Sequence, residues 1–415
     1  MSLRSGPAPQ VTDADAPPGP GEKRALRALT ASSMMSKVAD WQLGLVIPLA
    51  VLDRTGSVVM SLLSIALRGM AYVASPLLGA LIDRFDRRTV FVFAQVQQAL
   101  SLALIAVLLS HPVPLSVLLL FSGFGAVAST ITGQFVLIPS LVSRARRPAA
   151  TARLSSAVEF SKVIGLLLGG VLFSSRGPVV ASFGIAALYF GAGLLAMLLP
   201  RLPPEGKRTR LRADLALGFR WLVKPELLWL VVTMSVVNLA IGELETALIT
   251  QFTDKDLGAR AISVVLAVGL LVGAVGSRFA PSFLAGRRAE SRILVLQVIG
   301  FGTLGLIATP WLVVGIVGYT ALCLAVGASN VLSITYRQNS IPVELAGRVN
   351  ATIRMFITGS TTLSGLLYAG SSRLSGFRFW LPGLCMWGAA IAVWSLYIAS
   401  AGRLGKEDRG ALGEG

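Results

Sequence analysis

Long apolar stretches alternate with short polar breaks along almost the whole chain. We place twelve such stretches at 28–51, 57–82, 89–110, 113–137, 152–174, 177–199, 227–248, 261–284, 292–309, 311–335, 348–371 and 378–400. Each is close to the ~20 residues that a helix needs to cross a bilayer. Breaks such as Arg54-Thr55-Gly56 and His111-Pro112 are so short that the flanking helices must be antiparallel neighbours. The pattern predicts an all-α integral membrane protein with twelve transmembrane helices.

One break is long, and it divides the twelve stretches into six and six. This segment, 200–226, contains Pro203, Pro204 and a cluster of basic residues. From residue 211 onward, apolar residues recur on one helical face, which predicts an amphipathic helix in the membrane interface, although a plain linker explains 200–210 equally well. The expected organisation is a disordered cytoplasmic tail (1–22), an N-terminal six-helix half (23–200), a cytoplasmic linker with an interfacial helix (201–226), a C-terminal six-helix half (227–401) and a cytoplasmic tail (402–415).

The positions of the charged residues orient the chain. Hydrophobic residues make up 54% and charged residues 14% of the sequence, whereas a soluble domain carries about 25% charged residues. Most of the 37 lysines and arginines fall in alternate breaks and in the two tails. This distribution follows the positive-inside rule and predicts that both ends lie in the cytoplasm of a multi-pass cell-membrane protein, in the bacterial cytoplasmic (inner) membrane. The net charge of +17 therefore indicates topology rather than nucleic-acid binding.

A glycine followed by clustered charges joins the second and third stretches. The segment reads Gly79-Ala80-Leu81-Ile82-Asp83-Arg84-Phe85-Asp86-Arg87-Arg88. It resembles the signature loop of the major facilitator superfamily, with Asp86 where that family usually has its second glycine. The resemblance implies that Gly79 lets helices approach closely and that Asp83 binds the start of the eleventh span, near Gly347 and Arg348, to close a cytoplasmic gate. Alternatively, Arg84, Arg87 and Arg88 are only topological anchors.

A second resemblance lies between the tenth and eleventh spans. The run from Gln338 to Asn350, with Gly347-Arg348-Val349-Asn350 at its end, is similar to the exporter branch that contains macrolide-efflux and enterobactin-type siderophore exporters. The resemblance implies two six-helix halves, each built from inverted three-helix repeats. Two features depart from many drug/proton antiporters of this family. Leu166 stands where they carry a proline in the fifth span, and the fourth span contains no arginine.

Ionisable and amide side chains within the spans are the candidates for function, because burying them in a membrane is costly. Lys37 with Asp40, and Glu159 with Lys162, lie three residues apart and so on one helix face. Each pair is either functional or a self-neutralising pair that holds helices together. In the seventh span, Glu243 and Glu245 point about 200° apart on a helix, so they cannot both face one cavity. The candidates for the substrate cavity or proton coupling are Lys37, Asp40, Arg68, Gln97, Glu159, Lys162, Asn238, Glu243 and Arg354.

These observations predict a secondary transporter. The single histidine, His111, lies in a turn, which leaves no histidine-based catalytic group, and no phosphate-binding loop motif is present. We expect export of an organic compound (a siderophore, an antibiotic or another secondary metabolite), with protons as the coupling ion and with contacts to membrane lipid. We expect no cofactor, metal or nucleic acid, and a monomer. The alternatives are a lysophospholipid or nutrient carrier of the same fold and, in another class, a polytopic membrane enzyme or receptor.

Overall fold

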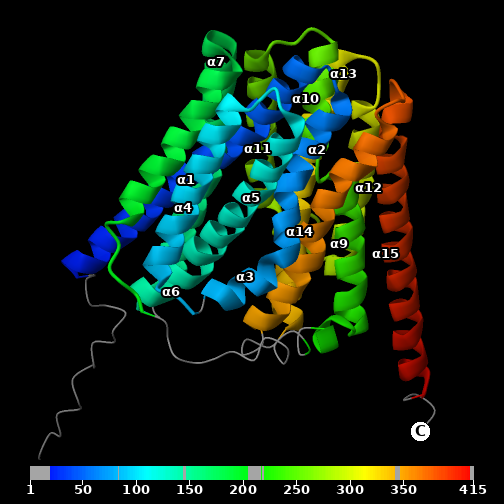
Figure 1. Ribbon diagram of the computed structural model, residues 1–415. Coiled ribbons are helices and arrows are strands. Elements are labelled where there is room, and N and C mark those ends of the chain that lie inside the picture. The colour runs from blue at the N-terminus through cyan, green and yellow to red at the C-terminus, as the bar shows by residue number, and fades with distance from the viewer. Residues whose placement is uncertain are drawn as a thin grey trace, which may run out of the picture.

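A computed structural model describes residues 19–82, 84–143, 146–203, 216, 219–341 and 346–411 (Figure 1). Within these ranges every regular element is a helix and no strand occurs. The predicted all-α architecture is therefore confirmed for this part of the chain.

The N-terminal half begins with a long helix and continues in shorter pieces. Its elements are α1 (Pro20–Thr55), α2 (Val58–Gly69), the 3-10 turn η1 (Met70–Ala74), α3 (Ser75–Ile82), α4 (Arg87–Val107), α5 (Pro112–Ile131), the π-helical turn η2 (Thr132–Val136), α6 (Leu137–Leu141) and α7 (Arg147–Ala196). Local chemistry sets several ends. Gly56 ends α1 in the left-handed conformation (φ 61°), and the Ser57 side chain accepts a hydrogen bond from the Met60 N–H at the start of α2.

Helix α7 consists of two antiparallel arms that correspond to the predicted fifth and sixth spans. The arms meet at Gly177, whose φ of 80° and ψ of 175° are not helical. Glycine tolerates this conformation because it has no Cβ. Pro178 follows at the start of the second arm, where its missing N–H costs no hydrogen bond. The expected tight hairpin between these spans is therefore built from a Gly-Pro pair.

The C-terminal half repeats the arrangement of long helices. Its elements are α9 (Pro225–Ile241), α10 (Leu244–Asp254), α11 (Ala259–Phe279), α12 (Ala289–Ile307), α13 (Leu312–Ser340), α14 (Ala346–Ser371) and α15 (Phe377–Ala411). The predicted seventh span is not continuous, since it breaks at Gly242 and Glu243 between α9 and α10. At this break a Cβ on Gly242 would lie 2.4 Å from the Thr361 Cα, so the break coincides with a close approach of α14.

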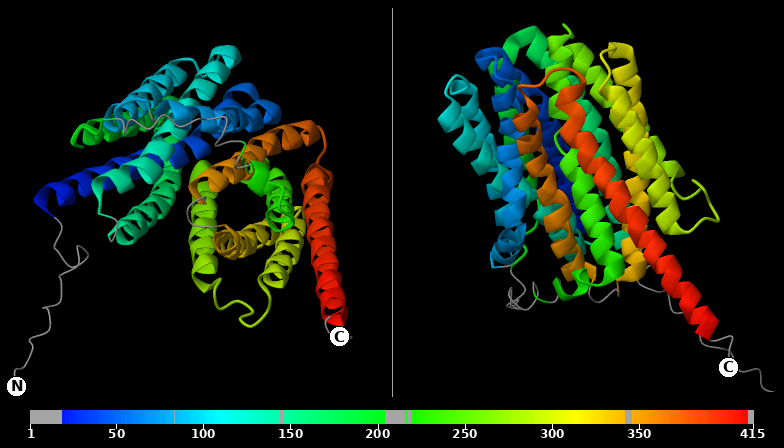
Figure 2. Two further views of the ribbon diagram at one scale, coloured as in Figure 1. Left: turned by 90° about the horizontal axis from the view of Figure 1, so that it is seen from below. Right: turned by 90° about the vertical axis from the view of Figure 1, so that its right-hand side faces the viewer.

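The two halves form two groups of helices that lie side by side (Figure 2). They meet where α7 packs against α11, where α2 packs against α14, and where α1 and α2 reach α10. The largest apolar cluster joins the halves, since it contains Leu45 and Leu49 of α1 together with Leu248 and Phe252 of α10. These contacts lie toward the top face in Figure 1, where α7 turns at Gly177 and α11 begins. The halves are therefore held together mainly at that face, which we call the top face.

The opposite face carries the connections that were predicted to be cytoplasmic. The start of α1, the start of α9 and the end of α15 all lie there, at the bottom of Figure 1. Nine helical stretches of the described chain are long and apolar enough to cross a membrane. Helix α7, with its two arms, counts as one of them, and α14 is not among them. The membrane nature of the fold is thus supported, whereas the number of twelve crossings and the cytoplasmic side of the bottom face stay predictions.

Several helix ends differ from the predicted boundaries. The first span was placed at 28–51, but α1 extends from Pro20 to Thr55, so helix occupies the last part of the expected tail. At the other end α15 continues to Ala411. Most of the expected interfacial helix, at 204–215 and 217–218, falls outside the described residues, as does the tail before residue 19. The charged extensions of α1 and α15 carry no apolar signal, which is why hydropathy alone ended both helices early.

Candidate functional site

Asp40 lies at the centre of an ionic network in the N-terminal half. Its Oδ2 is 2.7 Å from the Lys37 Nζ, and its Oδ1 is 2.6 Å from an Arg68 terminal nitrogen. The Tyr189 hydroxyl donates a hydrogen bond of 2.5 Å to the same Oδ1. The charged side chains of Lys37, Asp40 and Arg68 are only 16%, 11% and 14% exposed. Mutual pairing offsets the cost of placing these charges inside a helical bundle.

Further hydrogen bonds extend this network over five helical segments. Arg68 also donates to the Gln98 amide oxygen (3.1 Å) and to the Tyr189 hydroxyl (2.9 Å), and Lys37 donates to the Thr130 hydroxyl (3.0 Å). The participating side chains come from α1, α2, α4, α5 and the second arm of α7. With two cations around one carboxylate, the network carries an excess of positive charge. We call these six side chains (Lys37, Asp40, Arg68, Gln98, Thr130 and Tyr189) the Asp40 network.

Of the adjacent pair Gln97 and Gln98, only the second belongs to the Asp40 network. Gln97 donates instead to the Phe121 carbonyl (2.8 Å) and to the Ser101 hydroxyl (3.3 Å), between α4 and α5. Neighbouring residues of a helix point about 100° apart, so only one of the two amides can face Asp40. The sequence showed that an amide was available in this span, but it did not show which residue faced the network.

The pair Glu159 and Lys162 forms a second site on the first arm of α7. Their Oε1 and Nζ lie 2.8 Å apart, and the Glu159 side chain is 61% exposed. The Lys162 ammonium also lies 5.4 Å from the centre of the Trp41 ring. It interacts electrostatically with Glu245 of α10, in the other half. Lys162 is therefore placed between the two halves, separate from the Asp40 network.

The remaining span candidates lie apart from one another in the C-terminal half. Asn238 donates to the Ile357 carbonyl (3.1 Å), which ties α9 to α14. Glu243 is 6% exposed and its carboxylate accepts a hydrogen bond from the Thr246 hydroxyl (2.9 Å). No ion pair of Glu243 with another described residue is present. Arg354 is exposed on α14 and interacts electrostatically with Arg337 of α13.

The expected gating loop is only partly described. Asp83 lies outside the described residues, as do the side chain of Arg348 and the surroundings of Gly347, so the contact between them stays a prediction. A Cβ added to Gly79 would meet no described atom within 4 Å, so the described residues give no close approach at this glycine.

The end of the gating loop is anchored by hydrogen bonds. Arg84 is exposed, and Arg88 stands beside Arg87 in the first turn of α4. The Arg87 side chain donates to the Ser140 hydroxyl of α6. Asp86 begins α4 by accepting hydrogen bonds from the Thr89 N–H (2.8 Å) and hydroxyl (2.9 Å).

Asp86 also connects the loop to the end of the N-terminal half. Its second oxygen accepts a hydrogen bond of 2.7 Å from the Leu202 N–H, beyond α7. Although partial burial opposes ionisation, the hydrogen bonds from Thr89 and Leu202 lower the pKa of the Asp86 carboxyl. The aspartate that departs from the family's loop pattern thus has a structural role.

A large open cavity, with basic residues in a mainly apolar lining, lies at the bottom face between the first turns of α1 and the start of α7. Its volume is about 670 Å³, within the ~300–1,000 Å³ typical of small-molecule sites. The wall on α1 contains Lys23, Arg27, Thr30 and Met34, and the opposite wall contains Arg146 and Arg153, with Glu22 paired to Arg146 at 2.7 Å. We call this space the bottom cavity.

The cavity-lining residues of α1 continue toward the Asp40 network. Residues 23, 27, 30 and 34 recur every three or four positions, and the same spacing leads to Lys37 and Trp41. All six are incompletely buried, as are the adjacent Ala31, Met35 and Asp40, whereas 17 residues of α1 are buried. One accessible stripe of α1 therefore runs from the bottom cavity to the Asp40 network and to Trp41, which Lys162 contacts.

The sequence matches one family model and several individual proteins. The family model described as Major Facilitator Superfamily matches residues 29–365. The chain is 28% identical over 379 residues to the enterobactin exporter EntS of Salmonella typhi, covering 87% of this chain and 91% of that protein.

Solved structures are similar in fold at low sequence identity. A bacterial homologue of the iron transporter ferroportin in its inward-facing state is 15% identical, with a TM-score of 0.72 over 90% of this chain and 98% of that chain. The outward-facing state of a bacterial ferroportin homologue gives 16% identity and a TM-score of 0.61 over 90% and 99%. These likenesses show that the chain shares the fold of these transporters.

Proposed function

This chain belongs to the major facilitator superfamily of membrane transporters, and from this premise we propose that it exports an organic compound from the cytoplasm. The observation that carries the proposal is the accessible stripe of α1, from the bottom cavity to the Asp40 network. A transporter needs a polar site deep in the fold that is reachable from one side at a time. The stripe supplies the path, and the apolar contacts at the top face supply the closure.

The direction and the substrate class follow from further features. If the bottom face is cytoplasmic, as the basic residues predict, the bottom cavity receives its substrate from the cytoplasm. The similarity to proteins named enterobactin exporters supports a siderophore or a related secondary metabolite as the cargo. A cavity of about 670 Å³ accepts a bulky compound, and its arginine and lysine residues favour one with acidic or oxygen-rich groups.

We further propose that protons drive export through Asp40. A coupling carboxylate must change its partners as the protein changes conformation. Asp40 is bound by Lys37 of its own helix and by Arg68 of α2. The first partner moves with Asp40 and the second belongs to another helix, so a shift between α1 and α2 would alter the balance of charges on Asp40.

Transport in whole cells tests the direction and the cargo. We would express the chain in a bacterium that lacks its own siderophore exporter, and measure the siderophore in the medium and in the cytoplasm. Export by the wild type together with retention in cells without the chain would support the proposal. Equal retention in both strains, across siderophores and antibiotics, would contradict it. Addition of a protonophore separates coupling from transport, since export that continues at full rate would exclude a proton gradient as the driving force.

A further inference from the structure

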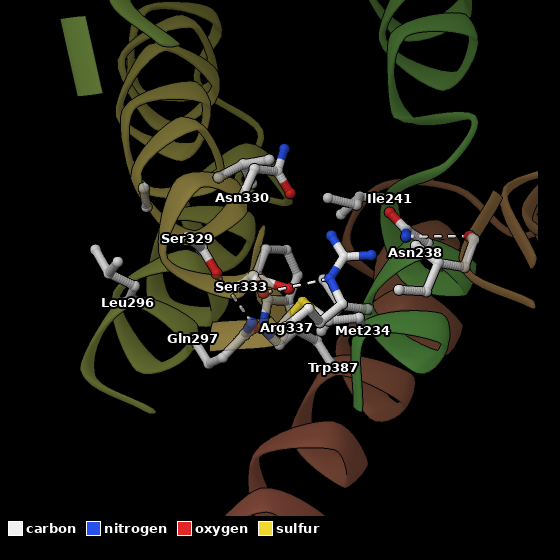
Figure 3. Close-up of a pocket in the computed structure, with 14 residues that line it drawn as sticks. Met234, Asn238, Ile241, Leu296, Gln297, Ser329, Asn330, Ser333, Arg337 and Trp387 are labelled. Carbon is white, nitrogen blue, oxygen red and sulfur yellow. Dashed lines mark hydrogen bonds between the residues drawn. The ribbon is translucent and has the colours of Figure 1, made fainter. Parts of the chain in front are cut away.

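A second and much smaller cavity lies within the C-terminal half, away from the Asp40 network. Its volume is about 50 Å³, and it lies among residues of α9, α12, α13, α14 and α15 (Figure 3). One water molecule occupies roughly 10–15 Å³ of space measured in this way. The cavity therefore has room for a few waters or for one carboxylate-sized group, but not for a whole organic substrate.

The floor of this cavity is polar and held in place. The Trp387 indole N–H donates to the Gln297 amide oxygen (2.8 Å), and the Gln297 amide nitrogen donates to the Ser329 hydroxyl (3.4 Å). Gln297 is 2% exposed and Trp387 is 1% exposed. Because these groups bond to one another, the floor is fixed in shape. Asn330, by contrast, is an exposed residue of the lining.

Arg337 supplies the charge of the cavity. Its Nε donates to the Ser333 carbonyl one turn earlier in α13 (3.3 Å). Its two terminal nitrogens donate to no other described residue, and none of the described residues that line the cavity is acidic. Figure 3 shows the guanidinium group in the space between Asn330 of α13 and Asn238 of α9. Arg354 adds a second positive charge that acts on Arg337 from α14.

This arrangement places two terminal guanidinium nitrogens with unused N–H donors in a cavity that no described acidic residue lines. A guanidinium presents a planar pair of N–H groups that matches the two oxygens of a carboxylate. An amide such as that of Asn330 offers further donors at the opening. We propose that the Arg337 cavity is an anion subsite of the transport path, which binds a carboxylate of the cargo while the rest of the molecule lies between the halves. This inference rests on the proposed function, and it specifies an anionic cargo.

Ligand binding to the purified full-length protein tests the subsite. The probes are 2,3-dihydroxybenzoate and its neutral amide, which share an aromatic ring but differ in the carboxylate. Saturation-transfer NMR measures such weak binding directly. We expect the wild type to bind the acid at least about tenfold more tightly than the amide, since a charge-assisted pair exceeds a neutral one by this order.

Variants of Arg337 then identify the group responsible. Arg337→Gln should remove the preference for the acid, and Arg337→Lys should retain part of it, because lysine keeps the charge but not the planar pair of donors. Arg287→Gln is the matched control, because Arg287 is exposed in the segment between α11 and α12. Unchanged thermal stability of each variant shows that the fold persists. An unchanged preference in Arg337→Gln, or no preference in the wild type, overturns the proposal.

Two further comparisons separate the alternatives. If inorganic phosphate displaces the acid at equal concentration, the cavity is a general oxyanion site, such as one for a lipid headgroup, and the cargo subsite is overturned. Export assays distinguish this inference from the proposed function. Export without any acid preference leaves the function standing and removes the subsite. Loss of the preference in Arg337→Gln, in a protein that exports nothing, leaves the subsite standing and removes the function.

Discussion

The two halves of the molecule differ in how the ionisable side chains within their helices are paired. In the N-terminal half, Lys37, Asp40 and Arg68 come from two helices and meet in one network with three neutral partners. In the C-terminal half, Glu243 and Arg337 make no ion pair with any described residue. A closed ionic network fixes the relative positions of its helices, whereas a cation with unused donors is available to a ligand. Under our proposals, the Asp40 network of the N-terminal half would serve coupling, and the Arg337 cavity of the C-terminal half would bind an anionic group of a cargo that enters through the bottom cavity.

The largest effect should follow from opening the N-terminal network. Asp40→Asn leaves two cations without their carboxylate, and breaking a buried ion pair costs about 3–5 kcal/mol. We expect gradient-driven export to be abolished, while downhill exchange of substrate continues. Proteoliposomes with and without an imposed pH gradient measure the two activities separately. Asp53→Asn, at an exposed position of the same helix, is the control and should pump normally. Normal pumping by Asp40→Asn would show that the network is purely structural.

Contact between the halves at the top face is the next test. A Cβ on Gly170 of α7 would lie 2.2 Å from the Ser263 hydroxyl and 2.9 Å from the Ala259 carbonyl of α11. Gly170→Val should therefore separate the helices and open the top face. We would measure this in a variant in which serine replaces Cys323 and Cys385. A cysteine at position 263, where Ser263 is 1% exposed, should then react several-fold faster with an impermeant maleimide.

The matched control for this substitution is Gly302→Val. A Cβ there meets no atom within 4 Å, so the top face should stay closed and the cysteine should stay protected. Equal reactivity in the two variants would mean that the contact between α7 and α11 does not hold the halves together.

The second acidic pair should matter less than the first. The Glu159 side chain is 61% exposed, so solvent screens its ion pair with Lys162 and the pair stabilises the protein only slightly. We expect Glu159→Gln to reduce gradient-driven export without abolishing it. The same proteoliposome assay applies, with Asp40→Asn measured alongside. A complete loss in Glu159→Gln together with normal pumping in Asp40→Asn would reverse the assignment of the coupling site.

Helix spacing explains which parts of the site could be predicted from sequence. The pairs Lys37–Asp40 and Glu159–Lys162 follow from a separation of three residues, and both ion pairs are present. Arg68 and Tyr189 both donate to Asp40, but the three residues come from three helices. Residue spacing along one helix therefore could not predict these contacts. Tyr189 was overlooked because an aromatic residue in an apolar span reads as a packing residue. Similarly, Arg337 lies just beyond the predicted end of the tenth span at residue 335 and was not among the candidates, because only the neighbouring α9 and α12 make it part of a cavity.

The fold was more accessible to sequence analysis than the site. Hydropathy located the helical stretches because an apolar segment within the membrane must hydrogen-bond its own backbone N–H and C=O groups, which it does by forming a helix. The break between α9 and α10 was missed because Gly242 and Glu243 interrupt the hydrogen bonding without interrupting the apolar pattern. Such breaks depend on the approach of a neighbouring helix, here α14. Information of this kind is tertiary and does not appear in a hydropathy profile.

The smallest expected effect concerns Asp86, which links the first loop to the end of the N-terminal half. Asp86→Ala removes the cap of α4 and the hydrogen bond to Leu202, and losing such a cap costs about 0.5–2 kcal/mol. Asp86→Ser restores a capping oxygen and should recover part of the loss. Thermal unfolding in detergent measures both.

The contribution of Asp86 to the stability of the wild type should also depend on pH. Because folding lowers the pKa of Asp86, its stabilisation is complete above the pKa of the unfolded chain, about 3.9, and is lost as the pH falls through the folded value. The stability difference between wild type and Asp86→Ala should therefore narrow below about pH 4. A difference that stays constant down to the lowest pH at which the protein folds would show that the carboxylate charge has no part in the cap.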